Sequence, residues 1–179
     1  MTLPRLRRFR DSETASLSVE AVLVVPFLVW AFLGLFTITD AFRTVHANTI
    51  SAYTIGDALS RETDFVSPTY IEGLNDMHEI MTRSSGATDL RATLVHYDKN
   101  DQRFEVEWSY GTGDRTPLTT GSLSEIEASI PALAHGEAVV VVETWMPYSP
   151  MVDYLVKDME VYQAVATRPR YAPTIAWQE

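Results

Sequence analysis

Residues 21–38 read AVLVVPFLVWAFLGLFTI and contain no charged side chain. An α-helix of this length is about 27 Å long, close to the ~30 Å hydrocarbon thickness of a bilayer. Only a helix or a closed barrel satisfies its backbone in lipid, and one segment cannot form a barrel. A buried helix of a soluble domain normally has a polar face, and a cleaved signal has a shorter apolar run with a small-x-small site; we find neither here. The sequence therefore predicts one membrane-spanning helix over residues 16–39.

Two residues, Glu20 and Pro26, differ from the apolar background. A carboxylate at the hydrocarbon edge costs less than the ~2.5–3.5 kcal/mol expected at the helix centre, but it still needs a partner. The simpler alternative for Glu20 is a helix-start acid that faces headgroup water and is favoured by the helix dipole. Pro26 lies within the helix, where it removes one backbone hydrogen bond, and we expect a kink there.

Residues 16–28, SLSVEAVLVVPFL, resemble the opening of the TadE/TadG-like pseudopilins, which are minor components of tight-adherence (Flp-type) pili. The resemblance covers about residues 14–59. Besides the apolar helix, its specific parts are Val19, Glu20, Pro26, Asp40 and Arg43. The resemblance implies a pilin-like plan, in which one helix starts in the membrane and ends against a globular domain.

In that family a prepilin peptidase cuts the chain on the cytoplasmic side, five residues before the glutamate. The resemblance implies a cut between Ala15 and Ser16, although the family usually has glycine where this chain has Ala15. It further implies that Glu20 of one subunit pairs with the new terminal amine of a neighbouring subunit. Such a pair would fix the axial register, because a displaced subunit leaves a charge unpaired at low dielectric.

The first fifteen residues, MTLPRLRRFRDSETA, form an arginine-rich leader. Four arginines and two acids give residues 1–15 a net charge of +2, so the formal charge of −10 for the whole chain leaves −12 for residues 16–179. An arginine-rich flank stays in the cytoplasm by the positive-inside rule. We therefore expect a single-pass membrane protein with a cytoplasmic N-terminus. The family resemblance implies that the membrane is the bacterial inner membrane and that the C-terminal domain is periplasmic. The acidity of that domain argues against nucleic acid as a partner.

Two helical segments are expected after the apolar run. Residues 40–61 continue the membrane helix as an amphipathic helix with one stripe available to a domain core. That stripe consists of Ala41, Val45, Ala52, Ile55 and Leu59. A second helix begins at Pro68, because Ser67 is a capping hydroxyl and proline suits the first turn, and its apolar residues recur at helical spacing up to Met81.

Strand patterns begin after Gly86. The segment 90–97 is rich in β-formers, and the segment 104–110 alternates apolar and polar side chains. A DKND turn joins the two, and this pattern predicts a hairpin. The run AVVVV at 138–142 is typical of a buried strand, and a last strand is expected over 160–167.

The segments between and after these strands are expected to be a short helix within residues 122–133, a turn-rich stretch over 145–158 and a loosely held tail. The resulting fold class is α+β and pilin-like. A long N-terminal helix, transmembrane in its first half, packs on a roughly four-stranded antiparallel sheet, and additional short helices cover the same face. The expected organisation is a leader (1–15), a transmembrane helix (16–39) and an extracytoplasmic domain (40–179).

No catalytic, cofactor or metal site is expected. The chain lacks cysteine, which excludes thiolate chemistry, and no serine lies in a G-x-S-x-G elbow. His78-Glu79 opens like a zinc-protease helix, but Thr82 occupies the position of the second histidine. The DKND turn lacks the glycine and glutamate of a calcium loop. The four histidines, at 46, 78, 96 and 135, are expected to be ordinary surface or sheet residues.

Two functions remain. The first is a structural assembly subunit, a minor pseudopilin of a Tad (Flp-type) pilus with membrane lipid, other pilins, the Tad assembly machinery and a prepilin peptidase as partners. The second is a single-pass, membrane-anchored extracytoplasmic binding or sensory domain with no role in a fibre. Neither is an enzyme.

Overall fold

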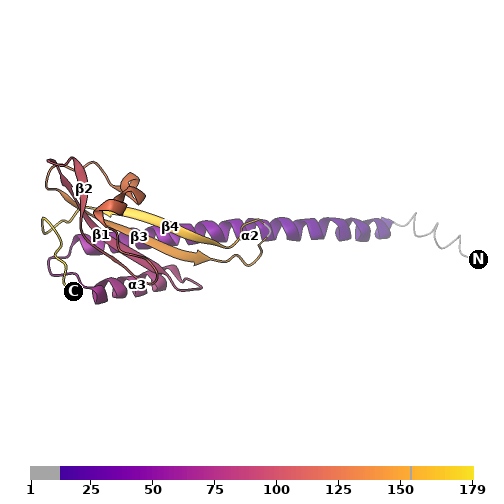
Figure 1. Ribbon diagram of the computed structural model, residues 1–179. Helices are drawn as coiled ribbons and strands as arrows, with labels where there is room; N and C mark the ends of the chain where they lie inside the picture. Colours follow the sequence, from indigo (N-terminus) through magenta and orange to yellow (C-terminus); the bar gives the residue numbers. More distant parts are fainter. Residues whose placement is uncertain (1–12, 154) are drawn as a thin grey trace, which may run out of the picture.

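The structure is a computed structural model that describes residues 13–179 except Tyr154, with side chains from Leu17 onward (Figure 1). Most of the predicted leader therefore lies outside the described residues. The elements in chain order are the helices α2 (Glu13–Ser60) and α3 (Pro68–Thr82), the strands β1 (Asp89–Asp98) and β2 (Arg103–Gly111), the 3₁₀ helices η1 (Thr120–Glu125) and η2 (Glu127–Ser129), and the strands β3 (Ala138–Tyr148) and β4 (Met159–Thr167). The predicted α+β plan, a long N-terminal helix on a four-stranded antiparallel sheet, is confirmed.

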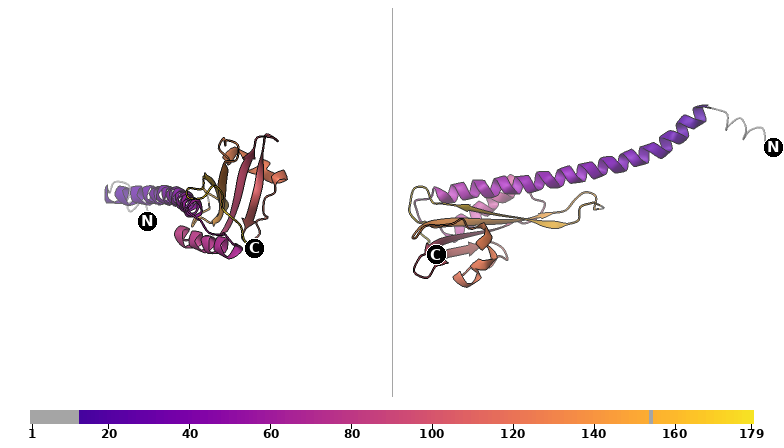
Figure 2. Two further views of the ribbon diagram at one scale, coloured as in Figure 1. Left: turned by 90° about the vertical axis from the view of Figure 1, so that its left-hand side faces the viewer. Right: turned by 90° about the horizontal axis from the view of Figure 1, so that it is seen from above.

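Helix α2 runs without interruption for 48 residues, about 72 Å, through Pro26 and through the charged residues after the apolar run. It bends gently on its way to the N-terminus (Figure 2, right). Its second half lies along the sheet, and the face that contacts the domain is buried. Val45 was predicted on that face but is 39% exposed. The buried position one turn away is Asn48, which accepts a hydrogen bond from Thr144 on β3 at 3.0 Å. A polar contact between helix and sheet therefore replaces part of the predicted apolar stripe.

The sheet has the order β2-β1-β3-β4, and all neighbouring strands are antiparallel. The predicted β1–β2 hairpin is confirmed, with Gln102 in the left-handed region (φ 50°) at its turn. Strand β3 is longer than predicted and continues through Pro147, so the prediction of a turn-rich stretch from Trp145 was wrong. The reason is that β1 begins at Asp89, opposite Trp145, and Pro147 pairs only with β4. A missing backbone donor is tolerated where a strand has a partner on one side only.

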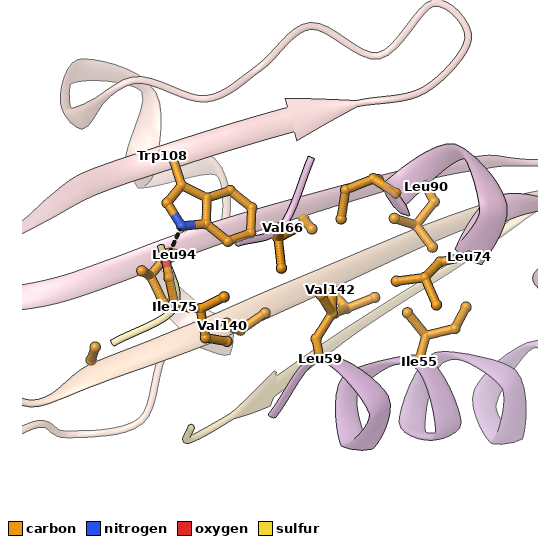
Figure 3. Close-up of a cluster of buried hydrophobic side chains, with 13 residues drawn as sticks. Ile55, Leu59, Val66, Leu74, Leu90, Leu94, Trp108, Val140, Val142 and Ile175 are labelled. Carbon is orange, nitrogen blue, oxygen red and sulfur yellow. Dashed lines mark hydrogen bonds between the residues drawn. The ribbon is translucent and has the colours of Figure 1, made fainter. Parts of the chain in front are cut away.

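The main core lies between the sheet and the two helices on one of its faces (Figure 3). Helix α3 begins as predicted: the Ser67 side chain accepts a hydrogen bond from the backbone N–H of Tyr70 at 3.3 Å. It runs antiparallel to α2 and packs beside it (Figure 1). The core side chains come from α2 and α3, the three strands β1, β2 and β3, and the C-terminal tail; they include Ile55, Leu59, Ile71, Leu74, Leu90, Leu94, Val140, Val142 and Ile175.

The C-terminal tail is part of this core, so the prediction of a loosely held tail was wrong. The indole N–H of Trp108 donates to the carbonyl oxygen of Ile175 at 2.7 Å, and the rings of Trp108 and Trp177 stack at a centroid distance of 5.0 Å. Val66 pairs with Trp177 in a short parallel bridge. The tail therefore covers the end of the core that the two helices leave open.

A second, smaller core lies on the opposite face of the sheet. The expected helix over residues 122–133 is replaced by the two short helices η1 and η2, and these cover the face away from α2 rather than the same face. In a 3₁₀ helix, residues three apart lie on one side. Leu123 and Ile126 can therefore both contact Val139 and Val141 on β3 without a full α-helix.

Candidate functional site: the apolar segment of α2 and its junction with the domain

The N-terminal half of α2 projects beyond the domain (Figures 1 and 2). Large apolar side chains are exposed on all sides of this half of the helix. Among the described residues, α2 is the helix that is long and apolar enough to cross a membrane. Only 11% of its most apolar 18-residue window is buried in the domain. A core helix of a soluble protein would be mostly covered, so an apolar surface of this size calls for a lipid or protein environment. Its exposed residues include Leu23, Phe27, Trp30, Phe32 and Leu35.

The predicted site residues all lie on this segment. Glu20 is exposed and makes no hydrogen bond or ion pair with any described side chain. Pro26 lies inside the helix, which continues on both sides of it. The backbone of Ala15 and Ser16 forms the start of α2, while their side chains lie outside the described set. The structure thus places the four positions on one continuous helix.

The junction between the apolar segment and the domain is a packed contact. Thr37 is buried, and the Tyr148 hydroxyl on β3 donates toward its carbonyl oxygen at 3.4 Å and toward the Asp40 carboxylate at 3.2 Å. Desolvation and the nearby Asp40 charge raise the pKa of Tyr148. The β3–β4 connection extends along α2 toward its N-terminal half (Figure 2, right). The domain therefore holds the helix up to the edge of the apolar segment.

A groove of about 450 Å³ opens at this junction, between α2, the end of α3 and the end of β3. Arg43 and His46 line it from α2, Arg83 from the residue after α3, and Tyr148 from β3. Arg83 has a left-handed backbone (φ 52°) where α3 ends. We name this feature the junction groove.

A buried charge pair lies on the opposite face of the sheet. The Arg91 guanidinium donates to both carboxylate oxygens of Glu143 at 2.7 and 2.9 Å, and to the Thr116 carbonyl at 3.1 Å. Tyr162 donates a further hydrogen bond to Glu143 at 2.9 Å, and burial together with the Glu143 charge raises the Tyr162 pKa. The Glu143 carboxylate is thus held by Arg91 and Tyr162, and loss of either member of the charge pair would leave the other buried and unpaired.

His78 is fully buried between α3 and α2, so the expectation of a surface or sheet position was wrong for this histidine. Its Nδ1 lies 2.8 Å from the Ser51 hydroxyl, and its Nε2 has no hydrogen-bond partner among the described residues. Burial lowers the pKa of His78 to about 4. The pattern that could have revealed this is the helical spacing of Ile71, Leu74 and His78.

We predict that this histidine makes the domain acid-sensitive. Because its folded-state pKa of about 4 lies below the ordinary ~6.5, the unfolded chain takes up the proton first as the pH falls. Stability is therefore expected to decline from pH 7 to pH 4, by about 3 kcal/mol, and this contribution to level off below pH 4. Denaturant unfolding of wild type and His78→Asn, which can keep the bond to Ser51, measures the difference in slope. Equal pH slopes in the two proteins would contradict the prediction.

Three carboxylates at the β1–β2 turn, Asp98, Asp101 and Glu105, have oxygens within 4.8 Å of one another. Arg103 forms ion pairs with Asp101 at 3.0 Å and with Glu105 at 2.7 Å. The arginine therefore already balances this exposed cluster, and the cluster carries no argument for a metal.

No protein-family model matches this chain, and neither a curated protein nor a solved structure matches it. The features of the chain itself that bear on function are the apolar segment and the junction groove.

Proposed function

We propose that this chain is a structural or assembly subunit of a bacterial tight-adherence (Flp-type) pilus, a minor pseudopilin of the TadE/TadG-like kind. In this proposal α2 crosses the inner membrane once, the N-terminus is cytoplasmic and the sheet domain is periplasmic. The observation that carries the proposal is the single helix that is apolar on all sides in its first half and part of the domain core in its second. Lipid, other pilus subunits, the Tad machinery and a prepilin peptidase are its proposed partners.

Glu20 favours assembly over simple anchoring. A membrane anchor needs apolar length, which residues 21–38 supply, and does not require an acid at the hydrocarbon edge. In an assembly of packed helices, the same acid can pair with the amino terminus of an adjacent subunit and set the register. The absence of a described side-chain partner for Glu20 within the chain is consistent with a partner on another subunit.

The alternative is a membrane-anchored extracytoplasmic binding or sensory domain, for which the junction groove is the favouring observation. Intact-mass measurement of protein from native membranes separates the two. A chain that begins at Ser16 supports the pseudopilin, and a chain that keeps Met1–Ala15 supports the anchor.

We predict that Glu20→Ala reduces piliation at least tenfold while carbonate-resistant membrane insertion is unchanged. The reason is that the substitution leaves the apolar segment intact and removes only the charge proposed to pair between subunits. Electron microscopy or pilin shearing measures piliation. Glu79→Ala, which removes an exposed glutamate from α3, is the matched control and should have no effect. Normal piliation in Glu20→Ala would rule out the assigned role.

A further inference from the structure

The junction groove is unusual in its charge. All six other arginines among the described residues pair with a carboxylate: Arg61, Arg91, Arg103, Arg115, Arg168 and Arg170. Arg43 and Arg83 line the groove and have no hydrogen bond or ion pair to a described side chain. In a chain with a formal charge of −10, two unpaired arginines on one groove point to an anionic ligand.

Asp40, the acid that lines the groove, does not neutralise Arg43 or Arg83. Asp40 is engaged by the Tyr148 hydroxyl at 3.2 Å and forms no ion pair with Arg43 or Arg83 in the described part of the chain. His46 and Thr44 add polar side chains to the same lining. The groove thus offers two guanidinium groups and further hydrogen-bonding groups, which suits the oxygens of a phosphate.

The position of the groove along α2 indicates where that phosphate comes from. Arg43 lies five residues beyond Ile38, the last residue of the apolar segment, which is about 7.5 Å along a helix. The headgroup layer on each side of the ~30 Å hydrocarbon core is about 5–7.5 Å thick. A bilayer that surrounds the apolar segment therefore brings lipid phosphates to the level of Arg43.

We propose that the junction groove binds the phosphate of an anionic phospholipid headgroup, held between Arg43 and Arg83. This rests on the membrane insertion of α2 in the proposed function, but not on pilus assembly. The bilayer itself keeps a lipid beside the groove at a high effective concentration, whereas a soluble phosphate must overcome the repulsion of the acidic domain without that advantage. The site would fix the depth and the rotation of the domain at the membrane surface.

The test uses the full-length chain in detergent micelles, titrated in separate arms with phosphatidylglycerol, phosphatidylcholine and inorganic phosphate, with native mass spectrometry as the readout. We expect preferential binding of phosphatidylglycerol and at least a tenfold loss of its affinity in Arg43→Gln/Arg83→Gln. The matched control is Arg103→Gln/Arg168→Gln, which removes the same charge from two exposed arginines outside the groove and should bind as wild type. Thermal melts verify that both double variants are folded.

Two outcomes would overturn the proposal: equal phosphatidylglycerol affinity in wild type and in the groove variant, or arginine-dependent binding of inorganic phosphate without a preference for phosphatidylglycerol. The second would assign the groove to a soluble phosphate instead. Carbonate extraction and piliation are measured separately, so a failure of the proposed function is distinguishable. If the chain binds phosphatidylglycerol through Arg43 and Arg83 but does not support piliation, the result supports the lipid site and contradicts the pilus role.

Discussion

Arg91→Met is expected to lower the free energy of unfolding of the domain by about 3–5 kcal/mol, because it leaves a buried carboxylate without its counter-charge. The Glu143 side chain is 1% exposed and that of Arg91 is 8% exposed. The substitution also removes the hydrogen bond to the Thr116 carbonyl. The guanidinium lies 5.3 Å from the centre of the Trp145 ring, so tryptophan fluorescence reports on the region. Urea unfolding of the full chain in micelles, followed by this fluorescence, is the measurement.

Two further variants test the cause of that loss. Arg91→Met/Glu143→Leu removes both charges and is expected to recover much of the stability, since a buried pair replaced by apolar residues is often neutral. Arg103→Met removes an arginine of an exposed ion pair and is expected to change stability little. Two results would contradict the explanation by an uncompensated charge. One is an Arg91→Met protein as stable as wild type, and the other is a double variant no more stable than Arg91→Met.

Ile55→Ala is expected to cost about 2–5 kcal/mol of unfolding free energy, the range for truncating a large aliphatic side chain in a packed core. Ile55 is fully buried on the sheet-facing side of α2. Beside it, Gly56 lies so close to β4 that an added Cβ would be 3.0 Å from the Thr167 hydroxyl. The helix cannot move inward to fill the cavity, since it already touches the sheet there. The same urea titration measures the loss.

The matched control is Ile50→Ala on the same helix. Ile50 is 48% exposed, so its truncation removes the same atoms with much less loss of buried area. Similar costs at the two positions would contradict the view that this half of α2 is core. A large difference would mean that the sheet-facing side of the second half of α2 is part of the domain core.

The fold was predictable where one local pattern decides the outcome. The uncharged run at 21–38, the Ser67-Pro68 helix start and the alternation after the DKND turn each specify an element without reference to distant residues. Together with the strands expected over 138–142 and 160–167, they predicted the four-stranded sheet and its helices. The positions of Glu20 and Pro26 on the helix were predictable for the same reason.

The rest depends on contacts between distant segments. Arg91 looks like a surface residue of a strand until β3 places Glu143 opposite it. The tail looks unstructured until Ile175 reaches Trp108, 67 residues earlier in the chain. The junction groove likewise needs the end of α3 beside α2, because Arg43 and Arg83 are forty residues apart in the sequence. Pairings at this range have no signature in a single sequence.

Helix α2 has no hinge between its exposed part and the sheet, because the same 48 residues serve both. Tension or torque applied to the exposed part of the helix is therefore transmitted directly to the domain. A domain joined by a flexible linker would not transmit it in this way. In a filament, every domain would keep the same orientation relative to its own helix. A force on one domain would act directly on its helix α2, because no flexible linker has to extend first.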